Sequence, residues 1–79
     1  MRGFNEWKTI TIARLLELKK NYMENAKAIQ TLDAIIYKVH YAKLRDLARV
    51  LFLLHAGSSD VPELLDLLPT TEEVEEWLK

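Results

Sequence analysis

The sequence predicts an all-α domain, a small helical bundle with two long antiparallel helices and two short C-terminal helices. Neither glycine nor proline occurs between Phe4 and Ala56, so no helix breaker interrupts that stretch. Apolar residues recur there at spacings of three and four, as they do along one face of a helix. Both prolines and the second glycine fall in the last third of the chain, where they divide it into shorter elements.

The first long helix is expected over about residues 6–24. Polar residues fall on one side of it and a broad apolar face on the other. That face comprises Thr11, Ile12, Leu15, Leu16, Leu18, Tyr22 and Met23. The alternation of Thr and Ile over residues 9–12 also fits a short strand, which is the alternative for this segment. Asn25 suits a turn into the next helix, because asparagine caps helices at either end.

The second long helix is expected over residues 26–56 and would be about 45 Å long. Its apolar face contains Ile29, Leu32, Ile36, Val39, Leu47, Val50, Leu51 and Leu54. His40 and Lys43 interrupt this face in the middle. A break near Tyr41–Lys43 is therefore the open alternative to one continuous helix.

Two short helices are expected over residues 60–68 and 71–78. Gly57 fits a C-cap that ends the preceding helix, and residues 60–63 have the Asp-x-x-Glu spacing of a capping box. Pro69 ends the first short helix, and residues 70–73 start the second.

The charges of the chain are divided between its two ends. Residues 1–49 hold ten Lys and Arg against five Asp and Glu, whereas residues 57–79 hold one Lys against seven Asp and Glu. The net charge of −1 therefore hides a basic part and an acidic part. Such asymmetry indicates a charged partner, or contact between the two parts within the chain. The acidic face predicted in the C-terminal helix comprises Glu72, Glu73, Glu75 and Glu76.

A basic row is predicted along the second long helix. It consists of Lys27, Lys38, Arg45 and Arg49, which fall within about 40° around a continuous helix axis. The row could be a solvated face, could contact an acidic protein surface, or could follow a nucleic-acid backbone. The only neighbouring aromatic residue is Tyr41, so the nucleic-acid signal is weak.

Five consecutive apolar residues, Val50–Leu54, surround the full circumference of a helix. The rest of a small domain could enclose them, or Phe52 and Leu53 could form an exposed binding patch. Trp77 joins this candidate interface because large aromatic residues are common anchors, although it could equally close one end of the core.

No motif for catalysis, a metal or a cofactor is recognised. The chain has no cysteine, and its two histidines, His40 and His55, are too far apart in sequence for a helical ligand pair. The residues of 55–60, His-Ala-Gly-Ser-Ser-Asp, are explained by a helix end followed by a helix start. We therefore expect a protein that is not an enzyme and carries no cofactor.

The chain is expected to form a single domain over residues 1–79, without a membrane span and located in the cytoplasm. The favoured function is that of a protein-binding module: an accessory subunit, adaptor or inhibitor that docks on a larger protein or complex. The alternative is a small dimeric regulator that binds DNA or RNA through the basic row. A homodimer is compatible with either function.

Overall fold

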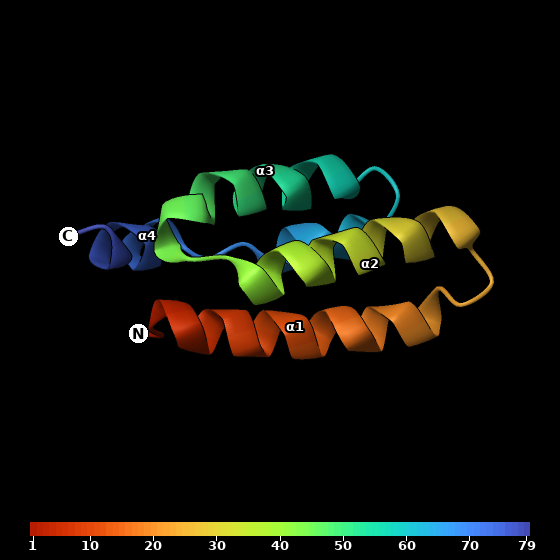
Figure 1. The fold of residues 1–79 in the computed structure, drawn as a ribbon, viewed down its shortest axis with the longest axis horizontal. Helices are drawn as coiled ribbons and strands as arrows, with labels where there is room; N and C mark the ends of the chain where they lie inside the picture. The colour runs from red at the N-terminus through yellow and green to blue at the C-terminus, as the bar shows by residue number, and fades with distance from the viewer.

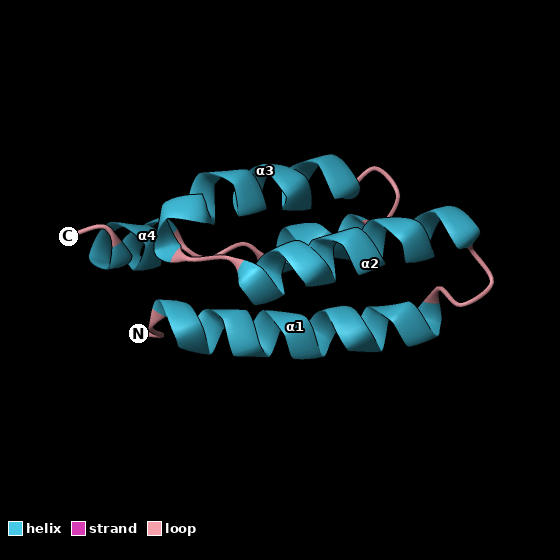
Figure 2. Cartoon of the chain, in the orientation of Figure 1, coloured by secondary structure: helices cyan, strands magenta, loops and turns pink.

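The computed structural model covers residues 1–79 and contains only helices and the turns between them (Figure 2). The elements are α1 (Phe4–Asn21), α2 (Ala26–Tyr41), η1 (Leu44–Asp46), α3 (Leu47–Gly57), η2 (Pro62–Leu67) and α4 (Thr71–Trp77), of which η1 and η2 are 3₁₀ helices. The all-α bundle predicted from the sequence is confirmed. Residues 9–12 belong to α1, so the alternative of a short strand is wrong.

The helices are arranged around α2. Helices α1 and α2 lie antiparallel, and α3 runs back along the other side of α2 (Figure 1). The η2 segment packs behind α2 and α3, while α4 lies at the end of the bundle that holds the N-terminus. The molecule measures 41 × 20 × 19 Å, so most of its length is that of one long helix.

One apolar core joins these elements. Helix α2 contributes a stripe at helical spacing, and the other elements pack on it from two sides. The buried apolar residues are Trp7, Leu15, Leu18, Ala28, Leu32, Ile35, Val39, Ala42, Leu47, Val50, Leu54, Val61 and Leu64. Each fully buried aliphatic side chain contributes about 1.5–3 kcal/mol relative to exposure.

The continuous helix expected over residues 26–56 is divided at Ala42 and Lys43, the break that the sequence left open. Ala42 is extended, with φ −70° and ψ 137°. The Asp46 carboxylate accepts a hydrogen bond from the Lys43 backbone N–H at 2.9 Å and so begins the next helical segment. Helix α1 is about 27 Å long and could not cover a helix of about 45 Å. Reversal of the chain brings the apolar face of α3 onto the same core as that of α2.

Gly57 has a packing role rather than the capping role expected from the sequence. It is buried within the last turn of α3, and no glycine in the chain has a positive φ. A Cβ atom placed there would lie 2.7 Å from Leu64 Cδ1, 2.9 Å from Ile35 Cδ1 and 3.0 Å from Thr31 Cγ2. The missing side chain therefore lets α3 approach both α2 and η2.

Replacement of Gly57 by valine should destabilise the fold by about 1–3 kcal/mol, because the added methyl groups overpack this junction. The Gly57→Ala variant should lose less, since the atoms it meets are the ends of side chains and alanine favours the helix. Urea unfolding of both variants measures the difference. A Gly57→Val variant as stable as the wild type would contradict the packing role.

The other helix ends agree with the sequence in part. Asn25 caps α2 by accepting the Ala28 N–H, and Thr70, where the sequence predicted the start of a helix, forms a capping box with Glu73. Asp60 does not cap a helix: its carboxylate accepts the Thr31 hydroxyl hydrogen bond at 3.0 Å. The segment expected as a helix over 60–68 is accordingly a 3₁₀ helix that starts later, at Pro62.

Candidate functional site

The basic row predicted along one helix does not exist as a straight line. Lys27 and Lys38 lie on α2, about 16 Å apart along its axis, whereas Arg45 lies in η1 and Arg49 in α3. All four side chains are exposed, and none has a carboxylate oxygen within 4 Å. Because α3 runs antiparallel to α2, the reversal brings Lys38 and Arg49 to the same hollow.

This hollow lies between α2 and α3, near the turn that joins them. Its volume is about 170 Å³. Its walls include Tyr37, Lys38, Tyr41, Asp46, Arg49 and Val50. The sequence analysis noted Tyr41 beside the basic row and missed Tyr37, although their spacing of four residues on one helix is a local signal that could have found it. Arg49 joins these residues only because the chain reverses.

Aromatic side chains form the outer edge of the hollow. Tyr37 and Tyr41 are 61% and 65% exposed, and their ring centroids lie 4.8 Å apart. The His40 ring packs edge to face against Tyr41, with the two ring centroids 4.7 Å apart. Large exposed aromatic groups beside cations are typical of surfaces that bind another macromolecule.

A second hollow follows the same seam between α2 and α3, toward the other end of the bundle. Thr31, Ala34 and Ile35 line it from α2, and Leu53, Ala56 and Asp60 line it from the opposite side. The two hollows together define what we call the α2–α3 groove. Small side chains, Ala34 and Ala56, line the second hollow together with Gly57.

The apolar candidates Phe52, Leu53 and Trp77 do not form one surface. Phe52 is 69% exposed on the outer side of α3, within about 60° of Arg49 and Ala56 around the helix. Leu53 is partly buried and faces the α2–α3 groove. Of the five consecutive apolar residues Val50–Leu54, only Phe52 is exposed, because the rest of the domain buries the other four at least in part.

Trp77 belongs to a cluster at the end of the bundle that holds the N-terminus (Figure 1). Its indole ring packs against Phe4 and Trp7, with ring centroids 5.6 and 5.8 Å away. Its Nε1 donates a hydrogen bond to the Arg2 carbonyl oxygen at 2.8 Å. Trp7 is fully buried, and its Nε1 donates to the Leu67 carbonyl oxygen at 2.9 Å. Trp77 thus closes one end of the core, the second interpretation of this residue that the sequence allowed.

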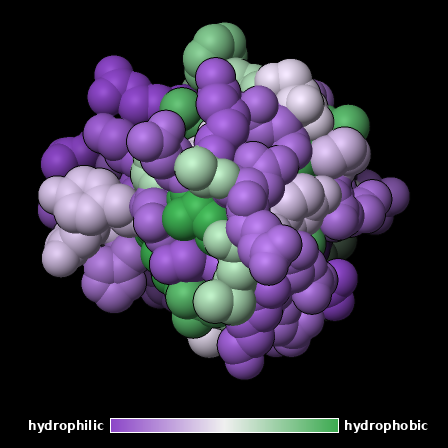
Figure 3. Space-filling view, turned by 90° about the vertical axis from the view of Figure 1, so that its right-hand side faces the viewer, coloured by the Kyte–Doolittle hydropathy of each residue, from purple (hydrophilic) through white to green (hydrophobic).

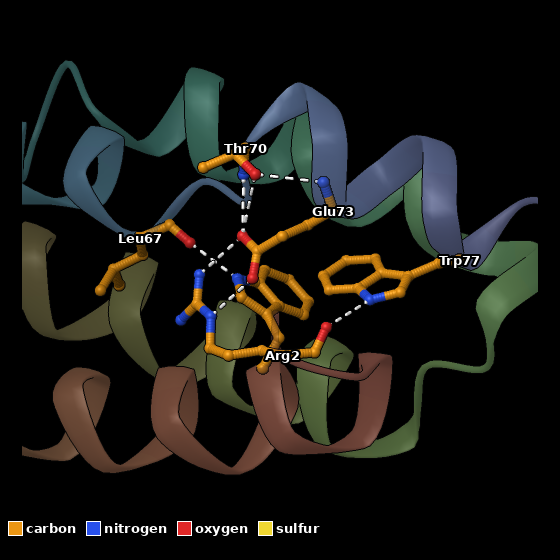
Figure 4. A network of polar contacts seen from close by, with 6 residues as sticks. Arg2, Leu67, Thr70, Glu73 and Trp77 are labelled. Atoms are coloured by element: carbon orange, nitrogen blue, oxygen red, sulfur yellow. Dashed lines mark hydrogen bonds and ion pairs between the residues drawn. The ribbon is translucent and has the colours of Figure 1, made fainter.

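Glu73 is the centre of a polar network in the same region (Figure 4). Its two carboxylate oxygens accept hydrogen bonds from Arg2 Nε at 2.8 Å and Arg2 Nη2 at 2.9 Å, and the Thr70 N–H donates to one of them at 3.0 Å. These bonds, that from Arg2 foremost, lower the pKa of Glu73 from 4.5 to about 2. We call this network, with its two tryptophans, the terminal clasp.

The acidic face predicted in α4 therefore consists of Glu72, Glu75 and Glu76, all exposed, without the buried Glu73. The acidic part of the chain does fold back onto the basic part, but not onto the basic row. Besides the terminal clasp, the contacts are hydrogen bonds to hydroxyl groups. They join Glu63 to Tyr22 at 2.7 Å and Asp60 to Thr31.

The serines and the aspartate of residues 55–60 are engaged in local and interhelix hydrogen bonds. Ser58 and Ser59 each donate to a backbone carbonyl of α3, and the Asp60 carboxylate is bound by Thr31. His55 therefore has no serine–carboxylate relay. No group of three histidine or acidic side chains is placed to hold a metal ion.

A third hollow between α1 and α2 is lined by Leu16, Lys19, Lys20, Met23 and Ile29, and Lys19 forms an ion pair there with Asp33 at 2.7 Å. The end of the bundle at the α1–α2 and α3–η2 turns is mostly hydrophilic, with apolar residues near its middle and a few at its edges (Figure 3). No helix combines the length and the apolar character needed to cross a lipid bilayer.

Compared with known proteins, the chain matches no family model, no curated protein and no solved structure.

Proposed function

We propose that this chain is a non-enzymatic protein-binding module that docks on a larger protein through one face of the bundle. The face comprises Tyr37, Lys38, Tyr41, Arg45, Arg49 and Phe52, and we call it the α2–α3 face. Its partner would make the chain an accessory subunit, an adaptor or an inhibitor. A cytoplasmic location, which the absence of cysteine favours, is part of the same proposal.

The observation that carries this proposal is that two exposed tyrosine rings, Tyr37 and Tyr41, share a hollow with the cations Lys38 and Arg49, neither of which has an ion-pair partner. The exposed ring of Phe52 lies next to Arg49 on α3. Tyrosine, phenylalanine and arginine are enriched at the centres of protein interfaces. The rings supply apolar area, whereas the cations direct the encounter with an acidic partner and speed association. The acidic α4 leaves these cations without ion pairs, so they are available to another molecule.

The hollow at Lys38 and Arg49 also supports a second function, binding of single-stranded nucleic acid. Bases stack on exposed tyrosine rings while phosphates contact neighbouring cations. This alternative requires binding that weakens steeply with salt. It is checked by titrating a fluorescent single-stranded oligonucleotide into the protein at two or more salt concentrations.

Immobilised wild-type chain should retain a specific protein from a lysate of its native cell, and Phe52→Asp and Arg49→Glu variants should lose it. Both substitutions are at exposed positions of α3, so the fold should persist. Met23→Asp is the matched control, because Met23 is 74% exposed but lies by the α1–α2 hollow. Quantitative mass spectrometry of the retained proteins measures the effect.

Each outcome of this comparison decides between surfaces. Loss in Phe52→Asp and Arg49→Glu but not in Met23→Asp supports the proposal. Loss only in Met23→Asp would place the interface on the α1–α2 side and contradict it. A chain that retains the same proteins in all four forms, or none, has no protein partner at the α2–α3 face.

A further inference from the structure

We infer that the α2–α3 groove receives one amphipathic helix of the partner, with the acidic end of that helix over Lys38 and Arg49. This inference rests on the proposed protein-binding function and adds the kind of segment that is bound. It follows from the length of the groove, from the size of its side chains and from the distribution of its charges.

The groove has the length and shape that a helix needs. Between Thr31 and Tyr41 it follows α2 for about 15 Å, which is almost three turns of helix. Helices α2 and α3 form its two walls and lie antiparallel (Figure 1). A third helix laid between two others packs by its side-chain ridges, with apolar anchors at positions i, i+3 or i+4, and i+7.

Small residues allow the bound helix to come close. Ala34 lies on one wall and Ala56 on the other, and both are exposed. Leu53 is partly buried between them and offers an apolar contact. Phe52 stands beside Ala56 on the outer side of α3, where it can cover the flank of the bound helix.

The charges give the groove a direction. Lys38 and Arg49 lie at one end with Arg45 nearby, and the one acid there, Asp46, already accepts the Lys43 N–H. At the other end Asp60 is the only charged residue that lines the groove, and Lys27 lies about one turn before Thr31 on α2. A helix with Asp or Glu in its last turn would place these carboxylates and the negative end of its dipole at the cationic end.

The same distribution disfavours the other occupants. A nucleic-acid strand along the groove would meet Ala34, Ala56 and then Asp60 rather than a continuous series of cations. The α4 helix of a second copy carries exposed carboxylates, but its apolar residue Trp77 is engaged in the terminal clasp. The one exposed apolar residue beside this helix, Leu78 at its C-terminal end, cannot by itself supply anchors at positions i, i+3 or i+4, and i+7.

A display library of helical peptides of about 16 residues, randomised on one face and at both ends, tests this inference on the folded full-length chain. Selected peptides should have apolar residues at helical spacing and Asp or Glu in the last turn. Selection on a Lys38→Glu/Arg49→Glu variant should instead enrich Lys or Arg at those end positions. Affinity of the acidic peptides for that variant should fall by about ten-fold or more.

An Ala34→Gln variant supplies the control for location. It puts a larger neutral side chain on one wall at an exposed helical position, so the fold should be retained while the selected peptides bind at least about ten-fold more weakly. Binding unaffected by Ala34→Gln, peptides without acidic ends, or no enrichment at all would overturn the inference. If these peptides fail while Phe52→Asp still loses a native partner, the groove is wrong but the protein-binding function stands. If both fail, the proposed function is wrong as well.

Discussion

Replacing Trp7 by alanine should destabilise the protein by about 3–5 kcal/mol. Trp7 is fully buried, and its ring contacts Phe4 and Trp77 with centroid distances of 6.1 and 5.8 Å. The substitution removes the ring from the core and also removes the hydrogen bond to the Leu67 carbonyl oxygen. Small domains have about 5–15 kcal/mol of stability, so this one change would leave the chain close to unfolding.

Urea unfolding followed by circular dichroism at 222 nm measures this effect, because tryptophan fluorescence would change with the substitution itself. Trp7→Phe should have an intermediate loss, since it keeps an aromatic ring but leaves the Leu67 carbonyl without its donor. Phe52→Ala is the matched control: its ring is 69% exposed, and removal should change stability by no more than about 0.5 kcal/mol. A Trp7→Ala variant within about 1 kcal/mol of the wild type would refute this account of the core.

Trp7 also shows where sequence reasoning succeeded and where it could not. Local signals placed two of the four expected helices well: the segment expected over 6–24 is α1, Phe4–Asn21, and that over 71–78 is α4, Thr71–Trp77. These elements depend on short-range periodicity and caps. The hydrogen bond from Trp7 to Leu67 joins residues 60 positions apart, and no local pattern in the sequence identifies such a partner.

The division of the second long helix had a local signal that was weak by itself. His40 and Lys43 marked the region, but the cap from Asp46 to Lys43 spans only three residues and occurs in many sequences. What decides the break is the mismatch in length between α1 and a continuous second helix, a property of the whole fold. The candidate site depends on the same reversal. Lys38 and Arg49, eleven residues apart, share one hollow because α3 folds back on α2.

Glu73 was expected on an exposed acidic face, because its neighbours in sequence are also glutamates. Its burial depends on Arg2, 71 residues away, which the sequence analysis did not connect to it. The same Glu73 serves as the third residue of a capping box at the start of α4, where the sequence analysis predicted a helix start but no capping box. The Glu73 carboxylate therefore both caps the start of α4 and links the two ends of the chain.

Replacing Glu73 by glutamine should lower the thermal unfolding midpoint at pH 6, and the difference from the wild type should shrink as the pH falls. The pKa of Glu73 is about 2 in the folded chain and 4.5 ordinarily. Because the folded-state pKa is the lower one, the ionised carboxylate stabilises the fold fully above pH 4.5. That contribution is lost as the pH falls from 4.5 toward 2. Glutamine does not titrate, so its variant lacks this component of the pH dependence.

Thermal unfolding of the two proteins between pH 6 and pH 2.5 measures the effect, and the Glu76→Gln variant is its matched control. Glu76 lies in the same helix and pairs with Lys79 three residues away, with both side chains well exposed. The Glu76→Gln variant loses the same charge as Glu73→Gln, but the ion pair that it removes is exposed and contributes little to stability. The unfolding midpoint at pH 6 should therefore change less than in Glu73→Gln. An Arg2→Gln/Glu73→Gln double variant should be no less stable than Glu73→Gln alone, because the Arg2 guanidinium has already lost its ion-pair partner in Glu73→Gln. Wild type and Glu73→Gln with the same pH dependence would show that the terminal clasp does not hold α4 in place.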